Sequence, residues 1–132
     1  MSNVDRQAQR ANVPVWFEIP AAELPRAVEF YETVLGVELT SQHIGGQDLA
    51  IFPRRAEAGT TGAVVAAPNQ KPSGNGVVVY LNADPQLAQV LARVPKAGGE
   101  VLLPRTALPD GMGYFAQIRD TEGNRVGLHA MA

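Results

Sequence analysis

Three side chains in this sequence are the candidates for acid–base or metal chemistry. His43 and His129 are the only two histidines, and Glu18 is a carboxylate inside an otherwise apolar stretch. An imidazole titrates near neutral pH, so His129 beside Glu18 could act as a catalytic general acid–base pair. The structural alternative is a polar pair that satisfies its own hydrogen bonds, or a histidine that frays near the C-terminus. The residue types favour this alternative over catalysis.

The same three side chains would be needed for a two-histidine, one-carboxylate metal site. Divalent catalytic metals usually take about three protein ligands, mostly histidine and carboxylate. His43, however, comes just before the Gly45–Gly46 turn, where a solvated loop residue is expected. The chain also has no cysteine, which excludes thiolate ligands and a cysteine nucleophile. We therefore expect no metal and no other cofactor.

Aromatic and polar side chains point to a binding site instead. Trp16, Phe52 and Phe115 could form one aromatic wall, with Gln117 as a polar group beside it. Small-molecule pockets typically combine aromatic rings with a few polar groups. Packing in the core or at a dimer interface is the structural alternative, and it is nearly as well supported. Trp16 is the strongest of these candidates.

Arg119 is the last candidate ligand-binding residue. It precedes the turn that begins at Asp120, where its guanidinium could bind an anionic group of a ligand. A salt bridge with Asp120 or Glu122 is the simpler explanation, and the spacing favours it.

Half of these residues lie on one element, the C-terminal hairpin GYFAQIRDTEGNRVGLH. Residues 114–119 and 125–129 have apolar side chains at every second position, which is typical of strands, and residues 120–124 form a turn with Asp and Gly. Val126 and Leu128 are assigned to the core, so Gly127 and His129 share the other face. On the first strand Tyr114, Ala116 and Ile118 group together, and Phe115, Gln117 and Arg119 face the opposite way.

The remaining elements repeat one order twice. The expected elements are strand 14–19, helix 23–35, strands 37–43, 48–53 and 61–67, then strand 77–82, helix 85–97, strand 100–104 and the hairpin. In the first strand Val15, Phe17 and Ile19 should face a helix, with Trp16 and Glu18 on the other side. Pro85 should open the second helix with Asp84 as its N-cap. The pattern predicts an α+β protein of two strand–helix–three-strand units.

Composition sets the remaining limits. A chain of 132 residues predicts one domain, residues 14–132, preceded by a flexible polar arm, residues 1–13. The net charge of −2 gives no reason to expect nucleic acid as a partner. There is no apolar run long enough to span a membrane and no signal-peptide pattern, so we expect no membrane contact and a cytoplasmic location.

The chain resembles the vicinal-oxygen-chelate superfamily, which includes glyoxalase I, bleomycin and fosfomycin resistance proteins, and extradiol dioxygenases. The matching stretches are VWFEIPAAELPRAVEFYETVLGV, KPSGNGVVVYLNADPQLAQVLARVPKAGGEVLLP and GYFAQIRDTEGNRVGLH. The resemblance implies two βαβββ modules, residues 14–67 and 77–131, joined by a linker, residues 68–76. It also implies mixed sheets that curl around a cavity, commonly completed in a homodimer.

The resemblance further implies where metal ligands would lie. Metal-dependent relatives place a histidine where this chain has Trp16, a second ligand at Val77 or Val79, and a glutamate at Gly127. The last strand of the first module, Thr61 to Ala67, has neither carboxylate nor imidazole. This departure indicates a member of the superfamily that works without a metal.

Three functions remain open from the sequence. The first is a protein that binds a small organic compound in a partly aromatic cavity, either sequestering it or acting on it through Glu18 and His129. The second is a glyoxalase I-like lyase or isomerase with a non-standard metal site. The third is a dimeric module whose cavity is vestigial. We expect the first, with a small organic molecule and a second copy of the chain as partners.

Overall fold

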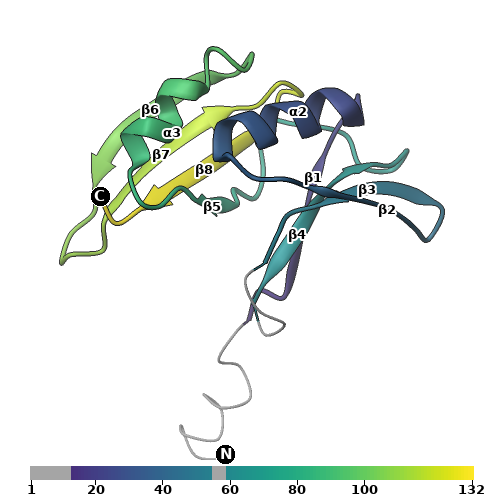
Figure 1. Cartoon of the computed structure of the whole chain (residues 1–132), viewed down its shortest axis with the longest axis horizontal. Coiled ribbons are helices and arrows are strands. Elements are labelled where there is room, and N and C mark those ends of the chain that lie inside the picture. Colours follow the sequence, from purple (N-terminus) through teal and green to yellow (C-terminus); the bar gives the residue numbers. More distant parts are fainter. Residues whose placement is uncertain (1–12, 55–58) are drawn as a thin grey trace, which may run out of the picture.

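The repeated order of elements is present in the structure, a computed structural model that describes residues 13–54 and 59–132 (Figure 1). The predicted flexible arm falls almost entirely on residues 1–12, outside the described residues. The elements are β1 (Trp16–Pro20), α2 (Leu24–Leu35), β2 (Thr40–Ile44), β3 (Gln47–Ile51), β4 (Thr61–Ala66), β5 (Tyr80–Asn82), α3 (Leu87–Arg93), β6 (Glu100–Ala107), β7 (Tyr114–Arg119) and β8 (Arg125–Ala130).

Each unit forms its own mixed four-stranded sheet. The strand orders are β1-β4-β3-β2 and β5-β8-β7-β6, so the same topology occurs twice. In each sheet the first strand pairs in parallel with the last, and the other neighbours are antiparallel. The predicted α+β fold of two βαβββ modules is confirmed.

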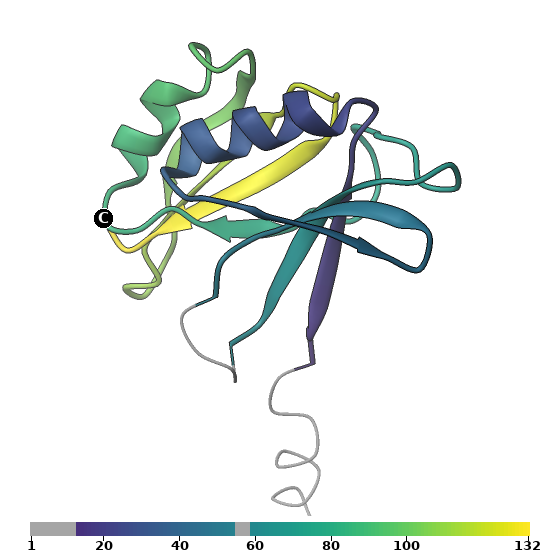
Figure 2. The same cartoon turned by 45° about the vertical axis from the view of Figure 1, so that its right-hand side comes forward.

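Helices α2 and α3 lie on one side of the two sheets, and the core lies beneath them (Figure 2). Helix α2 packs against β3 and β4 and contacts α3, which packs against β6, β7 and β8. Figure 2 shows α2 lying across the junction between the two sheets. The largest fully buried side chains, Tyr31, Phe30 and Leu87, come from the helices of both modules. One continuous hydrophobic core therefore joins the two modules.

The predicted facing of the C-terminal hairpin is confirmed. Ala116 and Ile118 on β7 are buried in the same core as Val126 and Leu128 on β8. The cross-strand pairs Phe115–His129 and Gln117–Gly127 then lie on the opposite face, away from the helices. On β1, Phe17 and Ile19 also face the core as predicted. Val15 does not: it precedes β1 and is 74% exposed.

Helix α2 forms where its apolar stripe predicts it. Pro25 lies in the first turn, and Gly36 ends the helix in the left-handed conformation with its N–H bonded to the Glu32 carbonyl. The second helix is shorter than predicted, Leu87–Arg93 rather than 85–97. Asp84 is not its N-cap, because its carboxylate accepts a hydrogen bond from the Met131 N–H at 2.8 Å. The segment after Arg93, which includes Pro95, forms turns instead.

Other strand boundaries shift by a few residues. Strand β6 continues to Ala107 rather than ending at 104, and bulges near Leu103 let this edge strand accommodate Pro104. Strand β5 begins only at Tyr80, although Val79 already accepts a hydrogen bond from the Gly127 N–H. No helix in the described part of the chain is both long and apolar enough to cross a membrane.

Candidate ligand-binding site

A cleft with a volume of about 860 Å³ lies between the two modules. Its walls come from β1, from the end of α2 and from the segment that leads into β5. The lining is mostly apolar, with Asp84 as its one charged residue among the described residues. It includes Trp16, Phe17, Phe52, Val77 and Tyr80. Volume and composition fall in the range of small-molecule pockets.

Trp16 gives this cleft an exposed aromatic wall on the first module. It is 43% exposed, and its indole Nε1–H donates to the Glu18 carboxylate at 3.2 Å. The other oxygen of Glu18 accepts from the Gln70 side-chain amide at 2.8 Å. The carboxylate therefore holds the indole in place from the next position on the same face of β1, on the side of the sheet away from the helices.

Tyr80 provides the matching aromatic residue on the second module, and its ring lies directly over Gly127. The two residues are paired in register on the parallel strands β5 and β8. A Cβ at Gly127 would lie 2.2 Å from Cδ1 of Tyr80, so only glycine leaves room for this ring. Phe115 meets the ring edge-on at a centroid distance of 6.2 Å.

A chain of hydrogen bonds ends on the Tyr80 hydroxyl. Arg125 Nη1 donates to the Gln117 side-chain oxygen at 2.9 Å, and Gln117 Nε2 donates to the Tyr80 hydroxyl at 2.7 Å. The predicted ligand-binding residue Gln117 is thus the middle of a three-residue array on the open face of the second sheet.

The three predicted aromatic residues do not meet in one wall. Trp16 and Phe52 both line the cleft, but Phe115 contacts Tyr80 on the other sheet. Phe52 is only 7% exposed and packs against Phe17 and Tyr31, with both centroid distances 5.6 Å. Most of the Phe52 ring therefore belongs to the core, and one edge of it reaches the cleft.

Glu18 and His129, the predicted catalytic pair, have different partners on different sheets. Glu18 bonds Trp16 and Gln70, as described above, whereas His129 Nε2 lies 2.7 Å from the Met112 carbonyl oxygen. A carbonyl only accepts, so this nitrogen carries the proton. Within the described residues the structure does not bring the two side chains together.

His43 is exposed to solvent as predicted, but it lies in strand β2 and not in a loop. Its Nδ1 is 2.8 Å from the Asp48 carboxylate on β3, and both side chains are exposed. Over residues 13–54 and 59–132, no three histidine, aspartate or glutamate side chains are close enough to hold a metal. The set of Glu18, His43 and His129 is therefore not assembled.

Arg119 forms an ion pair, though not with the predicted partners. Its guanidinium contacts Glu100, the residue opposite it in register on β6. Asp120 and Glu122 are instead bound to the first module. Asp120 accepts a hydrogen bond from Tyr31, and Glu122 accepts from Arg26.

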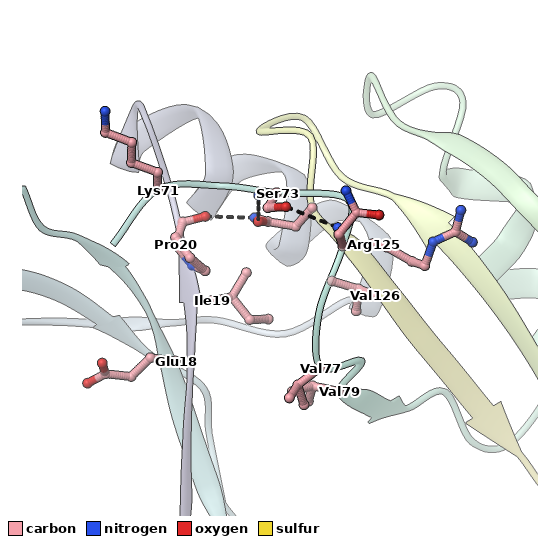
Figure 3. Close-up of a pocket in the computed structure, with 11 residues that line it drawn as sticks. Glu18, Ile19, Pro20, Lys71, Ser73, Val77, Val79, Arg125 and Val126 are labelled. Carbon is pink, nitrogen blue, oxygen red and sulfur yellow. Dashed lines mark hydrogen bonds between the residues drawn. The ribbon is translucent and has the colours of Figure 1, made fainter. Parts of the chain in front are cut away.

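A second, smaller pocket of about 180 Å³ lies between β1 and β8 (Figure 3). Ile19, Val77 and Val126 point into the space between the strands, whereas the charged side chains of Glu18 and Arg125 extend away from it. The Asn124 side chain closes one end, because its amide donates to the Pro20 carbonyl and its oxygen accepts from the Ser73 N–H. This pocket is a small space at the junction of the modules, with both polar and apolar residues in its lining.

The positions where the family resemblance places metal ligands carry tryptophan, valine and glycine in this chain. The indole nitrogen of Trp16 is a donor and offers no lone pair. Val77 and Val79 are apolar, and the space above Gly127 is filled by the Tyr80 ring.

The second wall of the cleft is therefore built from an aromatic side chain, Tyr80, that was not predicted from the sequence. Alternation along VVVYLN could have placed Tyr80 on the open face, but its partner Gly127 depends on the register of distant strands.

Solved structures of low sequence identity share this fold. A variant of glyoxalase I from Zea mays is 20% identical with a TM-score of 0.68 over 89% of this chain, which spans 45% of the maize chain. A glyoxalase-related enzyme from Fulvimarina pelagi is 16% identical with a TM-score of 0.67, covering 88% of this chain and 86% of that one. An antibiotic-binding protein from Streptomyces sp. CB03234 is 23% identical with a TM-score of 0.65, covering 89% and 93%.

A search of curated proteins gives no match. The sequence profile of one family matches residues 14–128, nearly all of the described chain. The same residues form the paired βαβββ modules, their shared core and the cleft between them. The chain therefore belongs to the Glyoxalase/Bleomycin resistance protein/Dioxygenase superfamily.

Proposed function

We propose that this protein binds a small organic molecule, without a metal ion, in the cleft between its two modules. The observation that carries the proposal is the 860 Å³ cleft, which has exposed aromatic residues on both walls, Trp16 and Tyr80. Aromatic side chains provide large contact areas for planar or conjugated ligands. One protein of this fold, from Streptomyces sp. CB03234, is an antibiotic-binding protein, which supports a binding role for the cleft.

The residues at the family's metal positions support a metal-independent mode of binding. Trp16 and the Tyr80–Gly127 pair place rings where a metal would need ligand atoms. The glyoxalase I-like alternative would need another set of ligands, and the two histidines are bonded to Asp48 and Met112. Sequestration of the ligand then requires contacts from the aromatic walls and nothing from acid–base chemistry.

A homodimer belongs to the same proposal. Val13, Val15 and Val77 are 70%, 74% and 92% exposed, and Val15 and Val77 lie next to Trp16 and to the cleft, respectively. Exposed apolar side chains gathered around a cleft are typical of a protein–protein interface. We expect sedimentation equilibrium to give a dimer and Val77→Asp to weaken it. A monomer at all concentrations would contradict this part.

The main experiment is thermal unfolding with a panel of neutral aromatic compounds, repeated with Trp16→Ala. A ligand at a hundredfold its dissociation constant stabilises the folded state by about 2.7 kcal/mol, which corresponds to several degrees in Tm. The shift should shrink in Trp16→Ala and persist in Ile44→Ala, a control that truncates another exposed apolar residue on the β2–β3 hairpin.

The metal content of the purified protein provides the opposing test. Ni²⁺, Zn²⁺, Mn²⁺ or Fe²⁺ should neither co-purify in stoichiometric amount nor raise the Tm. Stoichiometric metal accompanied by such a shift would overturn the metal-independent proposal and favour the lyase or isomerase alternative.

A further inference from the structure

Tyr80 is held more firmly than an exposed tyrosine usually is. The residue is 44% exposed, yet Gly127 lies beneath its ring, Phe115 contacts the ring edge-on and Gln117 donates a hydrogen bond to its hydroxyl. A side chain fixed in this way loses little conformational entropy when a ligand contacts it. It is a preorganised surface on the second wall of the cleft.

The direction of the hydrogen-bond chain determines what the hydroxyl offers. Arg125 can only donate, so the oxygen of the Gln117 amide must face Arg125. The amide NH₂ then faces Tyr80, whose oxygen accepts. Among residues 13–54 and 59–132, Gln117 is the only hydrogen-bond partner of this hydroxyl. The proton of the Tyr80 hydroxyl is therefore available to a ligand. The positive charge of Arg125, passed on through Gln117, makes this hydroxyl a stronger hydrogen-bond donor.

The charge around the cleft narrows the ligand class. Asp84 lines the cleft, and the Glu18 carboxylate accepts a hydrogen bond from the Trp16 indole on the opposite wall. Two carboxylates disfavour an anionic ligand, whereas a neutral carbonyl oxygen can accept from the tyrosine without such repulsion.

We propose that Tyr80 is the recognition residue of this cleft, and that its hydroxyl donates a hydrogen bond to the carbonyl oxygen of a neutral planar ligand that packs against its ring. This inference rests on the proposed function and extends it from a binding site to a ligand class. The Arg125–Gln117 pair makes the Tyr80 hydroxyl accept from Gln117, so that its proton is left for the ligand. The pair also positions the tyrosine ring, and it does so without touching the ligand.

The test uses two probes of almost identical shape, 9-fluorenone, which has one carbonyl, and fluorene, which has none. The chain has a single tryptophan, so the indole N–H resonance of Trp16 reports on binding in the cleft. Both probes should shift this resonance, and 9-fluorenone should bind about two- to tenfold more tightly than fluorene, the range of one net hydrogen bond.

Two variants separate the hydroxyl from the ring. Tyr80→Phe should abolish the preference for 9-fluorenone while fluorene binds as before. Gln117→Glu keeps the tyrosine but replaces the amide donor by a carboxylate that only accepts, so the Tyr80 proton turns to residue 117 and the preference should again disappear. Tyr114→Phe, a control whose ring packs against Arg105, should keep it.

The outcomes distinguish this inference from the function beneath it. Equal binding of the two probes by the unmodified protein, with the Trp16 resonance shifted, would overturn the role of Tyr80 and leave the binding function standing. A preference that survives Tyr80→Phe would also overturn it. Absence of binding by both probes would overturn the inference together with the proposed aromatic-ligand function.

Discussion

Glu122 and Arg26 form a two-bond ion pair across the boundary between the modules. Arg26 Nε donates to Glu122 Oε2 at 2.7 Å, and Nη2 donates to Oε1 at 3.1 Å. The same carboxylate accepts from the backbone N–H groups of Ala22 and Glu23 at 2.9 and 2.8 Å, just before α2 begins. The turn of the last hairpin therefore caps the first helix, and this contact fixes the orientation of the cleft walls.

This contact makes Glu122 important for stability at neutral pH. Burial opposes ionisation of the carboxyl, but the hydrogen bonds from Arg26, Glu23 and Thr121 lower its pKa from 4.5 to about 2. Glu122→Gln removes the charge, and we expect a loss of up to about 3 kcal/mol in the free energy of unfolding at pH 7. Urea denaturation at pH 7 measures it.

The stabilisation that the Glu122 charge provides should be lost in acid. Since the folded pKa lies below the unfolded one, the stabilisation is present above about pH 4.5 and is lost as the pH falls toward 2. The difference between the unmodified protein and Glu122→Gln should therefore shrink between these values. Glu38→Gln, an exposed carboxyl in the segment between α2 and β2, should leave the stability unchanged. A constant difference down to pH 2.5 would contradict the role of the charge.

Tyr31 makes a second bond between the modules, and it is fully buried. Its hydroxyl donates to the Asp120 carboxylate at 2.6 Å. Tyr31→Phe leaves that carboxylate with one bond fewer, and we expect a loss of about 1 to 3 kcal/mol by urea denaturation. Tyr80→Phe, which removes an exposed hydroxyl, should cost less than half as much. Equal losses would show that the buried bond has no special weight.

The buried hydroxyl of Tyr31 should also make the folded protein less stable at alkaline pH. Burial, followed by the charge and hydrogen bond of Asp120, raises the pKa of Tyr31 well above 10.0. The stabilisation is then full below the unfolded pKa, near 10, and falls as the pH rises beyond it. Tyr31→Phe should flatten the stability profile above pH 10.

Elements that depend on local patterns were predictable from the sequence, and contacts that depend on distant strands were not. The two faces of β7 and β8 follow from alternation, and α2 follows from its apolar stripe and Gly36. Asp84 looked like an N-cap because its side chain suits that role, but its carboxylate bonds Met131 instead.

The candidate site was predicted only in part, because some of its contacts follow from local alternation and others join distant strands. The facing of Trp16 away from the core needs only the alternation along β1. The ring of Tyr80 over Gly127 needs the parallel register of β5 and β8, which joins residues that are far apart in the chain. The role of Glu122 at α2 likewise depends on contacts across nearly a hundred residues.

His129 predicts a local effect on the loop between β6 and β7. Its Nε2–H donates to the Met112 carbonyl at 2.7 Å, and the loop also has a backbone bond from Leu108 N–H to Gly113 O. His129→Ala should cost about 1 kcal/mol and speed amide hydrogen exchange in residues 108–113. His43→Ala, the exposed histidine on β2, should change neither. Unchanged exchange in His129→Ala would show that the loop is held by its own backbone.

Gly127→Ala tests the packing that holds Tyr80. The added Cβ would lie 2.2 Å from Tyr80 Cδ1 and 2.4 Å from Cε1, so the ring must move off β8 and lose its bond to Gln117. We expect a loss of about 1 to 3 kcal/mol by urea denaturation, and a change in the tyrosine ring resonances. Gly74→Ala is the matched control, because its Cβ would have its nearest neighbour at an ordinary 3.8 Å and the backbone is not left-handed.

In the double variant Gly127→Ala with Tyr80→Ala the clash is removed, so Gly127→Ala should cost less in that background than alone. If the cost is the same in both backgrounds, the strain does not come from the Tyr80 ring. The interpretation of Tyr80 as a firmly held aromatic wall of the cleft would then be wrong.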